Sequence, residues 1–277
     1  MEYSAFPSPD YAVYAYGNEV YKFVRYNSKS GSNTEYHKRK SDSFEKFDSS
    51  FRRACSNILG ILLSNDFEFF FTGTLSPEKG DRFNLCEFRE KITQFMRDKR
   101  KKYNSAISYI LIPEPHKDGA IHFHGCVSVP YECLSRFDAS APLDLQRGDF
   151  YNWADYQKSF GFCSLSPIRD RMATAFYMLK YCTKDIGWRI HDIGGHLYYC
   201  SHNLNRPKLV DIVYGQETGI DCLLTSHNKF CSTGIQSLPF VGLGDIEDEK
   251  QVNEEFHYFC DCFERDMHEY LADFRYS

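Results

Sequence analysis

Long hydrophobic runs are missing from this chain of 277 residues. Its longest apolar stretches, residues 58–63 and 69–71, are far shorter than the roughly 20 residues that cross a bilayer, so we expect no membrane span. The opening segment MEYSAFPSPD also lacks the basic and apolar regions of a secretory signal, which makes the cytoplasm the expected location. Eleven cysteines occur without a CxxC pair, and this odd number favours reduced thiols over a disulfide scaffold.

Two common nucleotide-binding motifs are absent as well. The chain contains neither the P-loop pattern GxxxxGK[ST] nor the dinucleotide pattern GxGxxG. It therefore carries no recognisable helicase motor, and any separation of nucleic-acid strands has to come from another protein. Internal repeats with a period of roughly 20 to 50 residues, which indicate solenoids and propellers, are not found either.

The charge is unevenly distributed along the chain. Although the net charge is −5, residues 79–102 hold nine Lys or Arg against four Asp or Glu. Residues 245–273 hold eleven acids against two bases, so the remainder of the chain is mildly basic. A basic body with an acidic tail is compatible with nucleic-acid binding. The alternative is that both runs are solvated faces of helices.

Apolar periodicity predicts an α+β fold with a central antiparallel sheet of about five strands and flanking helices. Spacings of three and four indicate a helix from residue 43 to about 65, and others over 85–102 and 169–184. The clearest strands form a hairpin, SYILIPEP (108–115) and AIHFHGCVSV (120–129), joined by the turn HKDG. Further strands are predicted at 67–75, 161–168, 196–201 and 208–214. We expect an N-terminal extension at 1–42, partly flexible, one domain at 43–215, and a C-terminal extension at 216–277 with an acidic helix at 247–270.

The second strand of the hairpin contains two histidines with one residue between them. Side chains two residues apart in a strand point to the same face, so His122 and His124 project together and Phe123 projects to the other face. If the turn is centred near Asp118, Glu114 lies opposite His122 and adds a carboxylate to the same face. Two imidazoles and one carboxylate are ligands for a divalent metal ion. The alternative is that the histidines are ordinary polar residues of a half-exposed sheet.

A second constellation lies on the helix predicted over 169–184. Tyr177 and Tyr181 are four residues apart and share one helix face, and Lys180 flanks it. A phenol is a poor nucleophile at neutral pH, but neighbouring ammonium groups that favour the phenolate make attack on phosphorus plausible. The alternative is an aromatic stripe that packs into the core.

Together these features resemble the HUH endonucleases. The strand IHFHG with an acidic residue before it, and the Tyr-x-x-Lys-Tyr helix some fifty residues later, are similar to the two-tyrosine initiators of rolling-circle replication in small single-stranded DNA phages. The strand FFFTGTLSP also resembles the first motif of that family. The resemblance covers about residues 65–215 and implies that the predicted domain is an HUH-type nuclease, related in fold to RNA-recognition domains.

The resemblance further implies the role of each residue. His122, His124 and Glu114 would hold Mg²⁺ or Mn²⁺, Tyr177 and Tyr181 would be the nucleophiles, and Lys180 would position or neutralise the phosphate. The enzyme would nick and rejoin single-stranded DNA at a replication origin through a 5′-phosphotyrosine, leaving a 3′-hydroxyl that primes synthesis. A host helicase and polymerase would be its partners, and the host bacterial cytoplasm its location.

Three alternatives remain open at this stage. One is a relaxase or a transposase of the same superfamily. Another is a protein that binds single-stranded nucleic acid on its sheet, without catalysis and without a metal. The third is a zinc-type hydrolase that uses the histidines, which would leave the tyrosines of the helix without a role.

Overall fold

The computed structural model describes residues 11–18, 20–26, 43–104, 107–183, 196–213, 226–227 and 231–237. The chain divides into two compact units. The large unit comprises residues 41–205, and the small unit comprises residues 1–40 together with residues 206–277. Within the described ranges, no helix is both long enough and apolar enough to cross a membrane.

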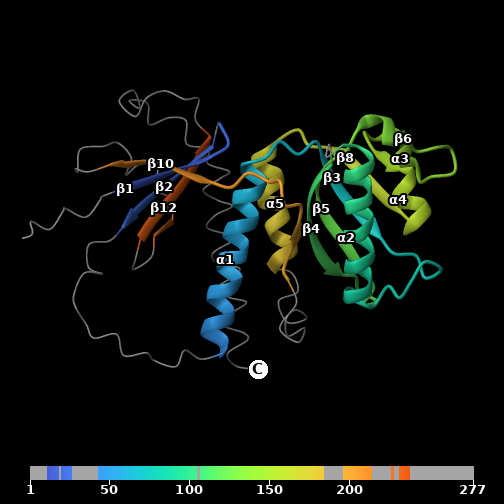
Figure 1. Ribbon diagram of the computed structural model, residues 1–277, viewed down its shortest axis with the longest axis horizontal. Coiled ribbons are helices and arrows are strands. Elements are labelled where there is room, and N and C mark those ends of the chain that lie inside the picture. Colours follow the sequence, from blue (N-terminus) through green and yellow to red (C-terminus); the bar gives the residue numbers. More distant parts are fainter. Residues whose placement is uncertain are drawn as a thin grey trace, which may run out of the picture. The chain divides into compact units, whose positions relative to one another are not determined.

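The large unit contains a seven-stranded antiparallel sheet in the order β6-β7-β8-β3-β5-β4-β9 (Figure 1). Its strands are β3 (Phe69–Thr74), β4 (Ser108–Pro115), β5 (Ile121–Ser128), β6 (Leu134–Arg136), β7 (Tyr151–Trp153), β8 (Cys163–Pro167) and β9 (Tyr199–Cys200). This arrangement confirms the predicted α+β class with a central antiparallel sheet. The sequence did not predict β6 and β7, because three residues are too few to show an alternating pattern.

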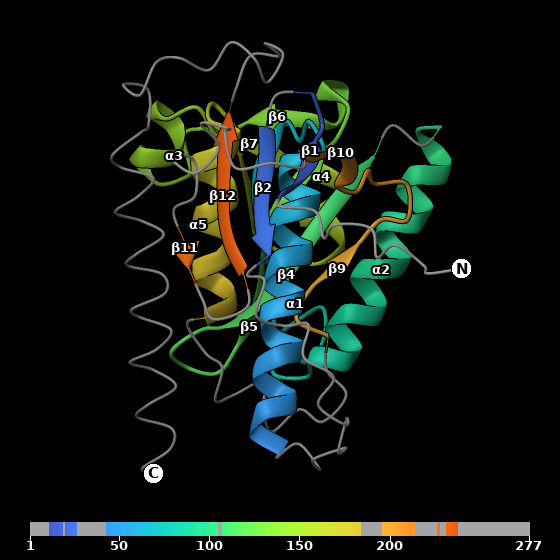
Figure 2. The ribbon, with the colours of Figure 1, turned by 90° about the vertical axis from the view of Figure 1, so that its left-hand side faces the viewer.

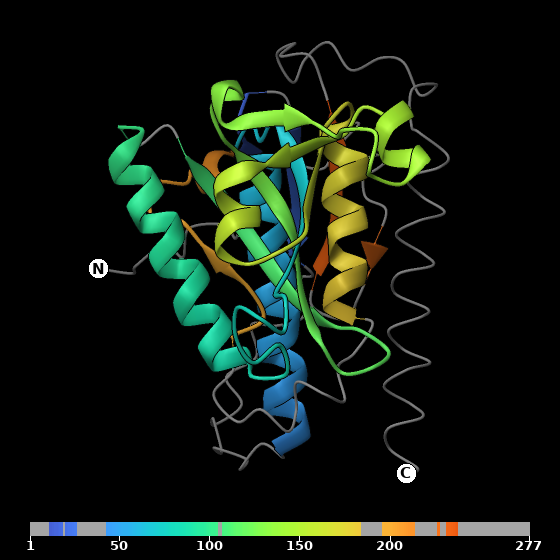
Figure 3. The ribbon, with the colours of Figure 1, turned by 90° about the vertical axis from the view of Figure 1, so that its right-hand side faces the viewer.

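Helices cover both faces of this sheet. They are α1 (Ser43–Leu63), α2 (Leu85–Lys102), α3 (Leu143–Arg147), α4 (Ala154–Ser159) and α5 (Arg171–Thr183). The helices α1 and α5 contact each other and the strands β4 and β5, whereas α2 lies on the opposite side of the sheet, as Figures 1 and 3 show. The three predicted helices are therefore confirmed as α1, α2 and α5.

The helix α2 has favourable residues at both ends. The side chain of Asn84 accepts a hydrogen bond from the backbone N–H of Glu87 at 3.1 Å, which caps the first turn. Four basic residues occupy the last turn, where positive charge is favourable beside the unpaired carbonyl groups. The buried face of α2 presents Phe88 to Phe123 of β5, with ring centroids 4.8 Å apart. The main hydrophobic core therefore lies between α2 and the sheet.

The β4–β5 hairpin has a fixed register. The N–H of His116 donates to the carbonyl of Ala120 at 2.7 Å, and Gly119 closes the turn with a φ of 85°, which a glycine adopts without strain. A Cβ at Gly125 would lie 2.2 Å from the carbonyl oxygen of Ile110, so this position of β5 requires glycine. The predicted hairpin is thus confirmed, with strand ends within one residue of those expected.

The small unit contains a five-stranded antiparallel sheet in the order β10-β1-β2-β12-β11, and Figure 2 shows β2 beside β12. Its strands are β1 (Tyr11–Tyr16), β2 (Val20–Tyr26), β10 (Lys208–Val213), β11 (Ser226–His227) and β12 (Cys231–Ser237). Two strands therefore lie within the predicted N-terminal extension 1–42. The strand expected at 208–214 as the last of the 43–215 domain is β10, which pairs with β1 in this second sheet. The acidic helix predicted over 247–270 lies outside the described residues.

Candidate functional site

The hairpin places the three predicted metal ligands on one face of the sheet. Glu114 of β4 is paired directly with His122 of β5, and His124 lies two residues further along the same strand. Between the histidines, Phe123 points the other way and is fully buried in the core beneath α2. The sequence expectation that these three side chains share a face is met by the observed register.

The two prolines beside Glu114 do not interrupt its strand. The strand β4 continues through Pro113 and Pro115, which pair with Phe123 and Ile121 of β5. On its other side, β4 is paired with β9 only at Ile110 and Leu111. The proline-containing end of β4 therefore lies beyond this pairing, where a missing backbone N–H is tolerated.

The imidazole of His124 is held from two sides. Its Nε2 lies 2.8 Å from Oε2 of Glu114, whose side chain is almost buried, and its Nδ1 lies 3.1 Å from the hydroxyl of Thr72 on β3. With an ionised carboxylate, Nε2–H donates to Glu114 and Nδ1 accepts from Thr72. Because a hydroxyl can donate or accept, Thr72 can also support the other tautomer, in which Nε2 has a free lone pair for a metal ion.

The helix α5 brings both predicted tyrosines to this face. The ring of Tyr181 stacks on the ring of His124, with centroids 4.1 Å apart and planes 12° apart. The hydroxyl of Tyr181 donates a hydrogen bond of 2.7 Å to the hydroxyl of Tyr177, as expected for neighbours on one helix face. Phe70 of β3 contacts both tyrosine rings and forms the floor beneath them. Groups some fifty residues apart in the sequence therefore meet at one place.

The two tyrosines have different surroundings. Tyr177 is 46% exposed, whereas Tyr181 is partly covered by its neighbours. Burial raises the pKa of Tyr181, and the hydrogen bond to Tyr177 and the charge of Glu114 raise it further. Tyr181 therefore keeps its proton at neutral pH and is suited to donate it in a hydrogen bond.

Lys180 lies beside the exposed tyrosine. Its Nζ is 5.7 Å from the centroid of the Tyr177 ring, and its side chain faces solvent. An ammonium group over an aromatic face is attracted to the ring and would also stabilise negative charge near the phenol oxygen. The structure thus places the predicted lysine next to one of the predicted nucleophiles.

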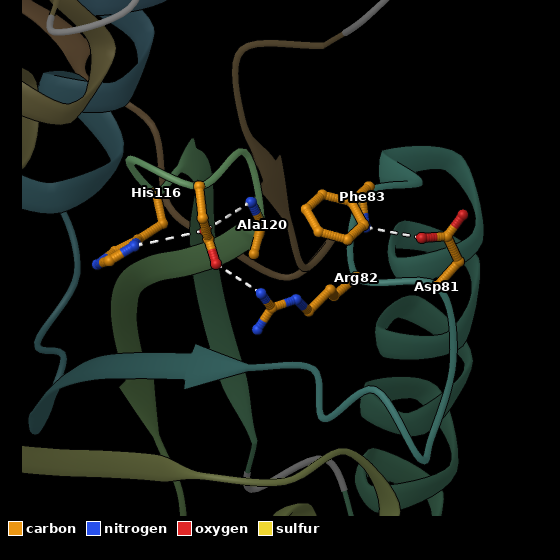
Figure 4. A network of polar contacts seen from close by, with 6 residues as sticks. Asp81, Arg82, Phe83, His116 and Ala120 are labelled. Atoms are coloured by element: carbon orange, nitrogen blue, oxygen red, sulfur yellow. Dashed lines mark hydrogen bonds and ion pairs between the residues drawn. The ribbon is translucent and has the colours of Figure 1, made fainter.

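His116, in the hairpin turn, extends the site in a direction that the sequence did not indicate. Its ring stacks on that of His122 at a centroid distance of 4.9 Å. Asp118 orients the turn: it forms an ion pair with Arg82, lies 3.5 Å from Nδ1 of His116, and accepts the N–H of Ala120 at 3.0 Å (Figure 4).

Burial lowers the pKa of His122, and the nearby imidazoles of His116 and His124 lower it further. The neutral imidazole, which is the form that binds a metal ion, is therefore favoured at this position.

The donor chemistry of this face suits a divalent ion. Two ligand atoms that each lie about 2.1 Å from an octahedral ion are about 3.0 Å from each other, close to the 2.8 Å that separates His124 from Glu114. The rings of His122 and His124 are nearly parallel with centroids 6.4 Å apart. In the described part of the chain, no three His, Cys, Asp or Glu side chains converge as they would around a bound ion. The residue types fit the predicted metal, and its binding would require the Glu114–His124 pair to separate.

Sequence reasoning missed three residues of this face: Phe70, Thr72 and His116. The first two belong to the strand FFFTGTL, which was recognised as a strand without individual roles. A signal was available for Thr72, because a third strand beside β5 had to place alternate residues opposite the histidines, and Thr72 is paired with His124. His116 had no such signal, since a turn residue has no fixed facing.

The basic cluster at the end of α2 is not part of this face. Arg97, Lys99 and Lys101 belong to a helix that packs on the opposite side of the sheet, as Figure 3 shows for α2 and α5. Lys99 forms an ion pair with Asp155 of α4 and is mostly covered. The cluster therefore lies away from the histidines and tyrosines.

Comparison with known protein families gives a match over the middle of the chain. Residues 68–186 match the model of a family described as replication-associated protein, of the ORF2 type. No curated protein and no solved structure matches the chain. The matched segment begins just before β3 and extends past α5, so it contains His122, His124, Glu114, Tyr177, Lys180 and Tyr181. Over this segment, which holds the whole of the site described above, the chain is similar to replication-associated proteins of that family.

Proposed function

We propose that the large unit is an endonuclease that nicks and rejoins single-stranded DNA through a phosphotyrosine intermediate and initiates rolling-circle replication. The similarity of residues 68–186 to replication-associated proteins supports a role in replication. The observation that carries the chemical part is the stacking of Tyr181 on His124, because it joins two phenols to an imidazole–carboxylate pair. A sheet that only bound nucleic acid would have no need of this combination.

Tyr177 is the better placed first nucleophile. Its hydroxyl is the acceptor of the hydrogen bond from Tyr181, and this donor, together with the ammonium group of Lys180, would stabilise a phenolate at Tyr177. In the reaction, Oη of Tyr177 attacks phosphorus and loses its proton to solvent. The bond from phosphorus to the 3′ oxygen breaks, and that oxygen takes up a proton. The 5′ phosphate remains on the tyrosine as a diester, and the free 3′-hydroxyl can prime synthesis.

His122, His124 and Glu114 would hold Mg²⁺ or Mn²⁺, and mixed imidazole and carboxylate ligands suit Mn²⁺ better. When bound, the ion would supply Lewis-acid stabilisation of the negative charge that develops on the phosphate oxygens. The protein contributes the orientation of these ligands. Thr72 fixes the ring of His124, and burial favours the neutral form of His122.

Tyr181 would serve the second transfer. Once Tyr177 is esterified, its oxygen has lost its proton and become a weaker acceptor, so the hydroxyl of Tyr181 is released from that hydrogen bond. The two phenol oxygens are only 2.7 Å apart, so a second phosphodiester can be attacked at the same place before the first linkage is resolved. Because each step exchanges one phosphodiester for another, rejoining needs no external energy source.

The test is the formation of a covalent protein–DNA adduct. The full chain is incubated with a pool of labelled single-stranded DNA of random sequence and Mn²⁺, and adducts are separated under denaturing conditions. We expect an adduct with the unchanged protein, a slower reaction with Tyr177→Phe, and none with the double variant Tyr177→Phe/Tyr181→Phe. A chelator should abolish the adduct. The matched control is Tyr131→Phe, an exposed tyrosine that contacts Phe69 on the α2 side of the sheet and should react normally.

Two outcomes would overturn this proposal in different ways. An adduct that persists in the double variant would show that another residue is the nucleophile. Binding of the DNA without any adduct, unaffected by the chelator, would favour a non-catalytic protein that binds single-stranded nucleic acid.

A further inference from the structure

We propose that Phe137 and Phe162 form a stacking platform for unpaired DNA bases next to the cut site. This inference rests on the proposed function, since it names the surface that would hold the substrate. The two rings lie with centroids 6.1 Å apart and planes 26° apart, and Phe162 is 43% exposed. An exposed pair of nearly parallel phenylalanine rings leaves flat apolar faces in contact with water, and a nucleotide base is a suitable partner for such a face.

The register of the sheet places this pair in line with the candidate site. His122 is paired with Glu114 on one side and with Thr74 on the other. The N–H of Thr74 in turn donates to the carbonyl of Phe162, at 2.9 Å, where the chain enters β8. Because neighbouring strands are roughly 4.8 Å apart, Phe162 lies two strand spacings, about 10 Å, from His122. An extended DNA strand lying across the sheet would reach both.

The alternation of side chains puts both rings on the same face as the histidines. Cys163, the first residue of β8, is buried in the core on the α2 side, so the residue before it faces the other way. Arg136 stacks on Tyr151, which packs against the core residue Phe69, so Arg136 is also on the α2 side. Phe137 follows Arg136 and is turned to the opposite face.

The backbone at Phe162 is held firmly. Its carbonyl accepts hydrogen bonds from both the N–H and the hydroxyl of Thr74, at 2.9 and 3.1 Å. The preceding Gly161 has a φ of 130°, and a Cβ there would lie only 3.0 Å from Ser76, so this turn requires glycine. A ring that is already fixed loses little conformational entropy when a base stacks on it.

The surroundings favour a nucleic-acid strand over a protein partner. Along the same face, the residues between the rings and the histidines are Thr72, Thr74 and Ser164. The apolar area is thus limited to the two rings, far less than the roughly 800 Å² per partner of a stable protein interface. A short apolar step bordered by hydroxyl groups suits a chain of bases joined by polar phosphates.

The test compares DNA with and without bases. Binding is measured by fluorescence anisotropy in the Tyr177→Phe/Tyr181→Phe background, where no cutting occurs, with labelled oligo(dT) and with an abasic strand of equal length. Substituting both phenylalanines by leucine should weaken oligo(dT) binding by roughly fivefold or more, from the usual strength of base stacking. The same substitution should leave binding of the abasic strand unchanged. Phe162→Trp should retain the preference for bases.

Tyr131→Leu is the matched control, because it removes an exposed ring on the opposite face of the sheet. An equal loss of affinity for both strands, or no loss at all, would overturn the platform. So would a change in sedimentation of the leucine variant without DNA, which would indicate that the rings mediate self-association. The covalent adduct assay tests the nuclease separately, and a platform failure with a normal adduct leaves the proposed function standing.

Discussion

The two faces of the seven-stranded sheet differ sharply in chemistry although the same strands build both. The face beneath α2 carries Phe69, Phe71 and Phe123, all completely buried in the core. The face toward α5 carries polar groups at the alternate positions, among them His122 and His124. Each reactive side chain is therefore one residue away from a core side chain.

This arrangement explains how the site is kept in place. Packing on the α2 side fixes the backbone of β3, β4 and β5, because close-packed interiors resist small displacements. The reactive groups on the other side inherit that rigidity without being part of the core. The nearly buried Glu114 is tolerated there because His124 provides a charge-compatible hydrogen-bond partner at 2.8 Å.

The largest expected effect comes from a pair of substitutions at adjacent residues. Phe123→Ala should lower the free energy of unfolding by about 3 to 5 kcal/mol, because it removes a fully buried ring that packs on Phe88. His124→Gln keeps a hydrogen-bond donor toward Glu114 and should cost about 1 kcal/mol, yet abolish the adduct. Denaturant unfolding can be followed by the fluorescence of Trp153, which is buried in the same core.

The control for this pair is Phe123→Leu, which retains most of the buried apolar volume and should cost less than the alanine variant. If His124→Gln destabilised the large unit as much as Phe123→Ala, the two faces would not differ in the way described. Stability would then depend equally on both.

The core of the site could be predicted because two simple periodicities determine it. Residues two apart in a strand share a face, which joins His122 to His124, and residues four apart in a helix do so too, which joins Tyr177 to Tyr181. The turn HKDG fixes the hairpin register and therefore places Glu114 opposite His122. These are local rules, and they hold whatever the rest of the fold does.

Other features depend on contacts between distant segments and were not predictable in this way. The pairing of β10 with β1 joins two ends of the chain, and no local pattern in residues 208–214 distinguishes one sheet from another. The side of the sheet on which α2 packs is also a tertiary choice, so the sequence could not show that its basic cluster faces away from the histidines. The support of His124 by Thr72 needed the strand order, which the sequence did not provide.

Thr72 provides the next test of the polar face. Thr72→Val preserves shape but removes the hydroxyl that contacts Nδ1 of His124, so the ring loses its orienting partner. Loss of such a partner usually reduces metal affinity or activity roughly 10-fold to 100-fold. We expect a corresponding rise in the Mn²⁺ concentration that gives half-maximal adduct formation, whereas Thr72→Ser should resemble the unchanged protein. Equal behaviour of the two variants would exclude a positioning role for the hydroxyl.

A smaller effect is expected from pH. Since the pKa of His122 is lowered in the folded chain, the unfolded chain binds the proton more readily below the ordinary value of about 6.5. The free energy of unfolding should therefore fall as the pH decreases through this region, and less steeply in His122→Gln. Denaturant midpoints measured from neutral to mildly acidic pH test this expectation. An unchanged slope in the variant would show that another group carries the pH dependence.

The smallest effect is expected from the basic cluster of α2. Arg97→Gln/Lys101→Gln removes two positive charges on the side of the sheet that faces away from the site. Long-range attraction of DNA should weaken by a few-fold at low salt and hardly at all at physiological salt, because exposed charges are screened beyond about 8 Å. The rate of adduct formation at saturating DNA should not change. A large decrease in that rate would mean that DNA contacts both faces during the reaction, and the division of labour between the faces would have to be abandoned.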